Sequence, residues 1–186
     1  MSAADFEDRL AAVWDGAEDV HEEEVVLAVE ALVAELPAGD PVGRFELASA
    51  HDYAGHEDQA VPLYRAALDA GLEGERRRQA VVQLASSLRL VGDPAGALQV
   101  LRENAPRPAG DDAIDDDESA DDADAADDEG SVEAHAAFEA LALVDLGRDR
   151  EAVTVLLAAL APHAAPYDRA VLRYAEELPD PPEGVS

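Results

Sequence analysis

The stretch RFELASAHDYAGHEDQAVPLYRAALDAG, residues 44–71, decides the fold. Gly55 divides it into two segments rich in Ala and Leu, residues that lose little conformational freedom in a helix. A glycine at such a position ends the first helix, because it adopts the left-handed backbone conformation without a Cβ clash. Five residues later, the small Ala60 lets the second helix approach closely, and Tyr64 fills the space one turn on. The stretch therefore predicts a helix hairpin.

The same frame recurs twice in the chain. It returns in VVQLASSLRLVGDPAGALQVLREN from Val81 and in AFEALALVDLGRDREAVTVLLAAL from Ala137. The turn glycine, the small residue and the large residue are Gly92, Ala97 and Leu101 in the second copy and Gly147, Ala152 and Leu156 in the third. In the second copy, Asp93 and Pro94 are typical of an N-cap and the first helical position. Three helix hairpins are therefore expected.

The spacing of the copies indicates a helical repeat with one insertion. Gly55 and Gly92 are 37 residues apart, close to a 34-residue helical repeat period, whereas Gly92 and Gly147 are 55 apart. The excess coincides with AGDDAIDDDESADDADAADDEG, residues 109–130. A segment so rich in Asp, Ala and Ser buries too little apolar surface to order itself. We expect a disordered acidic loop there.

Helices are also expected on both sides of the repeats. Residues 1–40 predict an acidic helical pair, over 3–14 and 19–36. Its apolar stripes are Phe6, Leu10, Val13 and Trp14, then Val20, Val25, Leu27, Val29, Leu32 and Leu36. The repeat domain is expected over 41–178, with repeats at about 41–74, 76–105 and 131–161. A capping helix over 165–178 would place Tyr167, Val171, Leu172, Tyr174 and Leu178 partly on one stripe, and the tail 179–186 would be loose.

The pattern Leu47, Ala48, Gly55, Ala60, Tyr64, Ala67, Leu68 resembles the tetratricopeptide repeat. More narrowly, residues 46–89 resemble a family of short bacterial tetratricopeptide proteins of unassigned function. Its second-helix proline and arginine triplet correspond here to Pro62 and to Arg76, Arg77 and Arg78. The resemblance covers roughly residues 40–178, and Asn104, Glu139 and His51 depart from its pattern. It implies an α-solenoid of about three helix hairpins whose first helices line a concave, peptide-binding side. The groove-facing positions it marks are Phe45, Ser49, Asp52, Tyr53, Gln79, Val82, Ser86 and Arg89.

Composition excludes several classes of protein. The chain has no cysteine, so disulfides and thiolate sites are excluded. No apolar run approaches the ~20 residues of a membrane helix, and the N-terminus does not resemble a secretory signal, so a cytoplasmic protein without membrane contact is expected. The formal net charge of −30 opposes binding to nucleic acid. All 13 basic residues are Arg, which fits a salt-rich cell interior but fits a GC-rich genome equally well.

Four polar clusters have a structural and a functional interpretation. His51, Asp52, His56, Glu57 and Asp58 could chelate a metal, but they span the Gly55 turn, where such residues complement helix dipoles. Glu18 and His21 form a single Glu-x-x-His motif, too little for a di-iron site. The acidic run 109–130 lacks the Gly and Glu positions of a calcium loop. The Arg76–Arg78 cluster either binds an anion or forms salt bridges with nearby acidic helices.

These features together predict a non-catalytic scaffold or adaptor that binds a peptide or partner helix, with no cofactor or metal. It would be a monomer or weak homodimer. Two alternatives remain open. One is a regulatory or assembly subunit that contacts its partner through the acidic N-terminal helices. The other is a helical enzyme with dispersed catalytic residues, although no motif for phosphate binding or nucleophilic catalysis is present.

Overall fold

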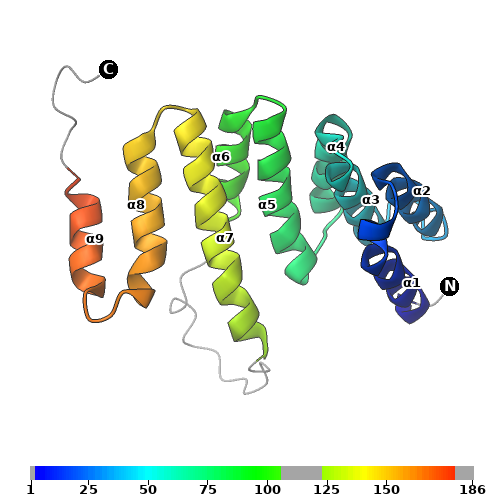
Figure 1. Ribbon diagram of the computed structural model, residues 1–186, viewed down its shortest axis with the longest axis horizontal. Helices are drawn as coiled ribbons and strands as arrows, with labels where there is room; N and C mark the ends of the chain where they lie inside the picture. The colour runs from blue at the N-terminus through cyan, green and yellow to red at the C-terminus, as the bar shows by residue number, and fades with distance from the viewer. Residues whose placement is uncertain (1–2, 106–122, 179–186) are drawn as a thin grey trace. The chain divides into compact units, whose positions relative to one another are not determined.

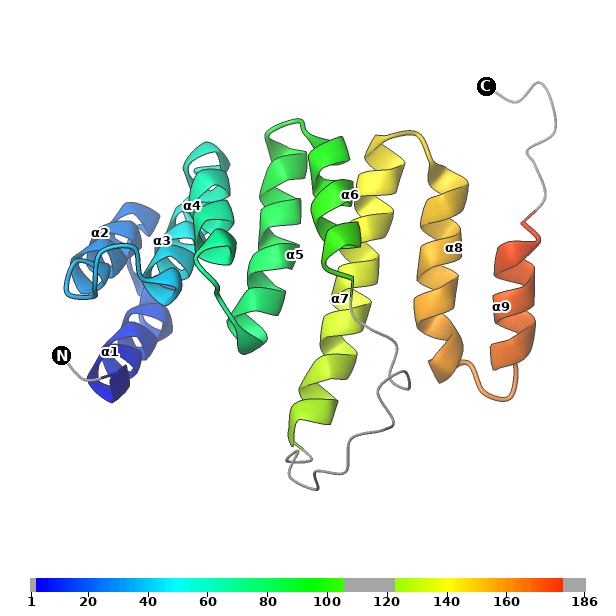
Figure 2. The same ribbon diagram turned by 180° about the vertical axis from the view of Figure 1, so that it is seen from behind.

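The computed structural model describes residues 3–105 and 123–178, with side chains described for 4–105 and 132–178. Nine α-helices lie within this part of the chain (Figures 1 and 2). They are α1 (Ala3–Asp15), α2 (Glu22–Val33), α3 (Pro41–Tyr53), α4 (Glu57–Asp69), α5 (Gly74–Leu90), α6 (Pro94–Glu103), α7 (Ala123–Asp145), α8 (Asp149–Leu160) and α9 (Asp168–Glu176). Single 3₁₀ turns follow α1 and α8. The predicted all-α helical repeat is confirmed.

The internal contacts divide the chain into two units, Met1–Gly96 and Ala97–Ser186. The first unit contains α1 to α5. The second contains α7 to α9 and most of α6. Each unit is described by itself below.

The turn glycines behave as the repeat frame predicts. Gly55, Gly92 and Gly147 have φ angles of 74°, 87° and 71°, in the left-handed region. The alanines five residues later, Ala60, Ala97 and Ala152, are at most 1% exposed. All three small side chains are therefore buried, as the frame predicts.

The large residue of the frame is buried in two of the three copies. Tyr64 and Leu101 are fully buried, but Leu156 is 45% exposed, so its predicted role as a filler of the third hairpin is wrong. Two full-length helices cover α4, whereas α8 is followed only by the nine-residue α9. A shorter neighbour covers less of the facing helix.

The N-terminal helices pack on the first repeat as one hydrophobic core. Its buried members are Phe6, Leu10, Ala17, Val25, Val26, Val29, Leu32 and Ala50. Two residues assigned to the predicted stripe lie outside it, since Val20 is 46% and Leu27 63% exposed. Helix α2 begins at Glu22, with His21 as its N-cap, so Val20 precedes the helix and does not share its apolar face.

The hairpin of α3 and α4 is fixed at its ends by polar groups. The Asp40 carboxylate accepts a hydrogen bond from the Gly43 N–H at 3.0 Å and caps α3, with Pro41 at the first helical turn. Asp93 caps α6 in the same way through the Gly96 N–H at 2.8 Å. Arg44 on α3 donates to the Ala66 carbonyl oxygen at 2.9 Å, which links the two helices of the hairpin.

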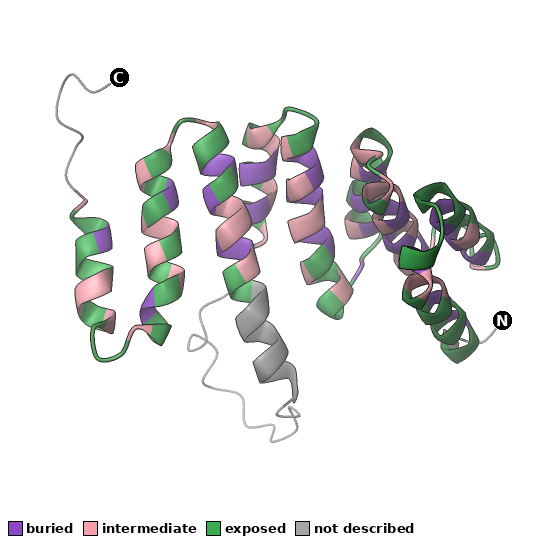
Figure 3. Cartoon of the chain, in the orientation of Figure 1, coloured by how far each residue is buried: buried purple, intermediate pink, exposed green. Residues whose placement is uncertain are grey.

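In the second unit, α7 and α8 form the third hairpin and α9 packs on α8. Glu139, where the repeat pattern has an apolar residue, accepts from Arg102 of α6 at 3.0 Å. Figure 3 shows α9 mainly exposed. Of its predicted apolar stripe, Val171 and Leu178 are half-buried, but Tyr167, Leu172 and Tyr174 are 43–70% exposed, so that part of the prediction is wrong. Ala175 is the buried residue of the helix. The Ala175 carbonyl accepts from Thr154 at 3.1 Å, so the helices approach through a small side chain.

The predicted acidic loop is described only at its end. Residues 109–122 and the predicted loose tail from 179 lie outside the described residues. Helix α7 begins at Ala123, and therefore includes residues 123–130, which the loop prediction had covered. Alanine is the best helix former, so the Ala-rich end of this segment can extend the helix that follows it. None of the described helices is long and apolar enough to cross a membrane.

Candidate partner-binding groove

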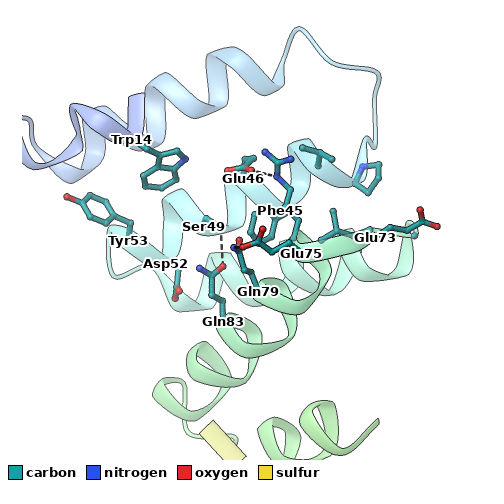
Figure 4. A pocket seen from close by; sticks show the side chains of 15 residues that line it. Trp14, Phe45, Glu46, Ser49, Asp52, Tyr53, Glu73, Glu75, Gln79 and Gln83 are labelled. Atoms are coloured by element: carbon teal, nitrogen blue, oxygen red, sulfur yellow. Dashed lines mark hydrogen bonds and ion pairs between the residues drawn. The ribbon is translucent and has the colours of Figure 1, made fainter. Parts of the chain in front are cut away.

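A groove of about 1000 Å³ lies within the first unit (Figure 4). Helices α1, α3 and α5 and the segment that joins α4 to α5 line it. The lining residues are Trp14, Pro41, Val42, Phe45, Glu46, Ser49, Asp52, Tyr53, Gly71, Leu72, Glu73, Glu75, Arg76, Gln79 and Gln83. The first helices of the first two repeats thus provide most of its surface.

Five of the eight predicted partner-binding residues meet in this groove: Phe45, Ser49, Asp52, Tyr53 and Gln79. Val82, Ser86 and Arg89 do not line it and are half-buried on α5. Helical geometry accounts for which of the α5 positions line the groove, because residues four apart share a helix face. Glu75, Gln79 and Gln83 form such a row on α5, and the other three positions lie to one side of it or further along the helix.

Several lining residues were not predicted as site residues. Trp14 comes from α1 and Gln83 from α5, while Gly71, Leu72 and Glu73 come from the segment before α5. Trp14 is the only tryptophan of the chain, which was a signal that the sequence offered. The approach of α1 to α3 and α5 depends on tertiary packing, so spacing along the chain did not reveal it.

A hydrogen-bonded network connects α3, α4 and α5 beside the groove. The Tyr64 hydroxyl donates to Gln83 Oε1 at 2.8 Å, and Ser49 Oγ donates to the same oxygen at 3.2 Å. Ser87 Oγ donates to Asp52 Oδ1 at 2.7 Å. Burial raises the pKa of Asp52 above its ordinary value, because desolvation disfavours the carboxylate more than the Ser87 hydroxyl stabilises it.

A second polar cluster holds the α1 side of the groove. Arg76 donates through Nε to Glu46 at 2.8 Å and through Nη2 to Glu7 at 2.6 Å. Glu46 is only 5% exposed, and the Trp14 indole lies near it. Burial raises the pKa of Glu46, although Arg76 and Trp14 oppose that shift. For Arg76, salt bridging is therefore the interpretation that the geometry supports.

Aromatic rings form one end of the groove. Trp14 and Tyr53 meet edge to face, with ring centroids 5.9 Å apart, and the Tyr53 hydroxyl donates to the Ala17 carbonyl at 3.2 Å. Tyr53 is 44% exposed. Figure 4 shows Asp52 near this end and Glu73 at the other. The groove thus offers an accessible aromatic surface beside carboxylates.

The histidines of the Gly55 turn lie close together but outside the groove. The His51 and His56 rings are 5.9 Å apart, and His56 Nε2 lies 3.2 Å from Glu23 Oε1 of α2. Burial lowers the pKa of His51, and the nearby His56 adds to this effect. Among the side chains of residues 4–105 and 132–178, no three or more His, Asp or Glu residues form a group that could hold a metal ion.

Comparison with known proteins agrees with this architecture. A family model described as tetratrico peptide repeat matches residues 41–122 and 115–178, which together cover α3 to α9. No curated protein and no solved structure matches the chain significantly. The matched residues include the three glycine turns and the three buried alanines. This chain belongs to the tetratricopeptide repeat family.

Proposed function

We propose that this protein is a non-catalytic interaction module whose groove binds a peptide segment of another protein. Tetratricopeptide repeats generally mediate protein–protein interactions. The observation that supports the groove as the binding surface is the open, 1000 Å³ hollow along α3 and α5, where five of the predicted positions meet. Its exposed Tyr53 and Gln79 offer apolar and hydrogen-bonding contact to a peptide.

The chemistry of the groove favours binding over catalysis. The Ser49 hydroxyl lies beside Gln83 and Tyr64, and neither side chain is a base that could activate it at neutral pH. No histidine is present among the described lining residues. The Tyr64 hydroxyl is itself buried, and burial raises its pKa, so it serves as a donor to Gln83.

Site-specific photo-crosslinking tests this function. A random peptide library is selected on the full chain, and the binders are crosslinked to a photoreactive residue at position 79 or at position 59. Gln79 lines the groove, whereas Gln59 is an exposed glutamine of α4 outside it. We expect capture at 79 and not at 59. Binders that crosslink equally at both positions, or only at 59, would refute the groove as the peptide site.

The alternative role, an assembly subunit that uses the N-terminal helices, has one observation in its favour. Leu27 of α2 is 63% exposed next to an acidic first turn of Glu22, Glu23 and Glu24. An apolar residue rimmed by charge is typical of a protein contact. This alternative predicts that Leu27→Asp weakens the binding of a partner protein, whereas Gln79→Ala leaves that binding unchanged.

A further inference from the structure

Among the described residues that line the groove, negative charges outnumber positive ones. Four carboxylates line it, from Glu46, Asp52, Glu73 and Glu75. Arg76 is the single cationic side chain among the described lining residues, and it already contacts Glu46 and Glu7. The charges of Asp52, Glu73 and Glu75 are therefore left without a cation from the groove itself.

These three carboxylates are distributed along the groove. Figure 4 places Asp52 at the aromatic end, Glu75 near the middle and Glu73 at the far end. Glu73 and Glu75 are exposed, and Asp52 is half-buried. A segment lying along the groove would meet carboxylates in succession and would need more than one cationic group to complement them.

The aromatic end strengthens the preference for a cation. The faces of Trp and Tyr rings attract ammonium and guanidinium groups, and this attraction increases where the site is partly desolvated. Tyr53 and Trp14 lie there, within the same groove as Asp52. A long arginine or lysine side chain can place its stem on the rings and its charged end near a carboxylate.

We infer that the peptide bound in this groove is basic, with arginine or lysine side chains that lie along Asp52, Glu73 and Glu75 beside the Trp14–Tyr53 pair. This inference rests on the groove as the proposed peptide site and adds the chemical class of the partner. Acidic segments are disfavoured, because they would bring like charges against the same carboxylates.

The desolvation of Asp52 agrees with a cationic ligand. In the free protein this carboxylate is half-buried, which raises its pKa and makes its ionised form less favourable in the folded state than in water. A bound guanidinium or ammonium would favour the ionised form and oppose that cost. Perturbed carboxylates concentrate at functional sites for this reason.

The overall charge of −30 requires a control, since such a chain attracts any polycation. The groove variant carries Asp52→Asn, Glu73→Gln and Glu75→Gln. The matched variant carries Glu24→Gln, Glu30→Gln and Asp58→Asn, which remove three exposed carboxylates of α2 and α4 outside the groove. Both variants change the net charge equally, and thermal melting verifies that both are folded.

In the test, peptides that bind are selected from the random library on the unaltered chain, the groove variant and the matched variant. The salt concentration is about 0.15 M, where the Debye length is about 8 Å. Peptides captured at position 79 of the unaltered chain should be enriched in Arg and Lys over the input library. The matched variant should keep this enrichment, and the groove variant should lose it. Individual basic peptides should bind the groove variant about tenfold more weakly.

The outcomes separate the two proposals. Peptides captured at position 79 without enrichment in Arg and Lys would overturn the inference and leave the groove as a peptide site. Equal loss of enrichment in both variants would also overturn it, because attraction would then come from the overall charge. No capture at position 79 would overturn both proposals.

Discussion

The small residues of the repeat frame are buried at sites without spare room. Ala97 and Ala152 are buried to 1% exposure or less, and Ala60 is fully buried. Packed interiors lack room for additional methyl and methylene groups. The repeat geometry at these points therefore depends on the absence of a side chain beyond Cβ.

Replacement of Ala97 or Ala152 by Leu is predicted to destabilise the protein by about 1–3 kcal/mol through overpacking. Ala95 on α6 and Ala158 on α8 are exposed and provide controls on the same helices. Because Leu is nearly as good a helix former as Ala, the control variants should melt close to the parent. Chemical denaturation of the four variants measures the difference. Equal stability of buried-site and control variants would contradict the repeat frame.

Asp52 connects stability with binding at a single residue. Burial raises the pKa of Asp52, so the folded state favours the protonated side chain more than the unfolded state does. The stabilisation of the fold by this proton is fully present below the ordinary carboxyl pKa and is lost as pH rises through the folded-state pKa. Asp52→Asn is therefore predicted to be more stable than the parent at pH 7, since Ser87 can still donate to the amide oxygen.

The pH dependence identifies the cause. The stability advantage of Asp52→Asn should shrink towards zero as pH falls below about 4, where Asp is protonated in both states. Melting curves of both proteins across pH 3–8 measure it. A variant that is less stable than the parent at pH 7 would show that the carboxylate stabilises the fold, contrary to the assigned burial effect.

At the scale of elements, Arg76 joins three helices. Its guanidinium on α5 contacts Glu46 on α3 and Glu7 on α1. Glu46 is almost fully buried, so the loss of its cation would leave a carboxylate with poor solvation. The arrangement aligns the helices that form the groove.

Arg76→Gln is predicted to destabilise the protein by about 1–3 kcal/mol, because it leaves the buried Glu46 without its charged donor. The second substitution Glu46→Gln should restore much of the loss, since a neutral amide needs no counter-charge. A double-mutant cycle by denaturant unfolding measures the coupling. Additive losses in the double variant would mean that the two residues act independently.

At the scale of the whole molecule, the charge of −30 is the dominant property. Like charges on a folded surface repel more strongly than in the expanded, unfolded chain. Stability is predicted to rise with salt, because the Debye length shortens from about 30 Å at 0.01 M to about 3 Å at 1 M. Melting temperatures in NaCl across this range test the prediction. A flat or falling curve would reject charge repulsion as a main destabilising term.

Local sequence was sufficient for the repeat frame. Gly55, Gly92 and Gly147 have the backbone conformation that their position after an Ala- and Leu-rich segment predicts. Turn chemistry, helix propensity and the burial of a small residue five positions later are all short-range properties of the chain. For that reason the hairpins could be predicted from the sequence alone, whereas the groove positions were expected only from the resemblance to the tetratricopeptide repeat.

Tertiary structure decided which apolar residues are covered and what completes the groove. Leu156 and Tyr174 follow helical patterns yet remain exposed, because coverage depends on the length of a neighbouring helix that the pattern does not contain. Trp14 enters the groove from α1, and Arg76 is neutralised by Glu7, some 69 residues earlier in the chain. Contacts between residues so distant in sequence depend on how the helices pack, and packing makes the groove acidic.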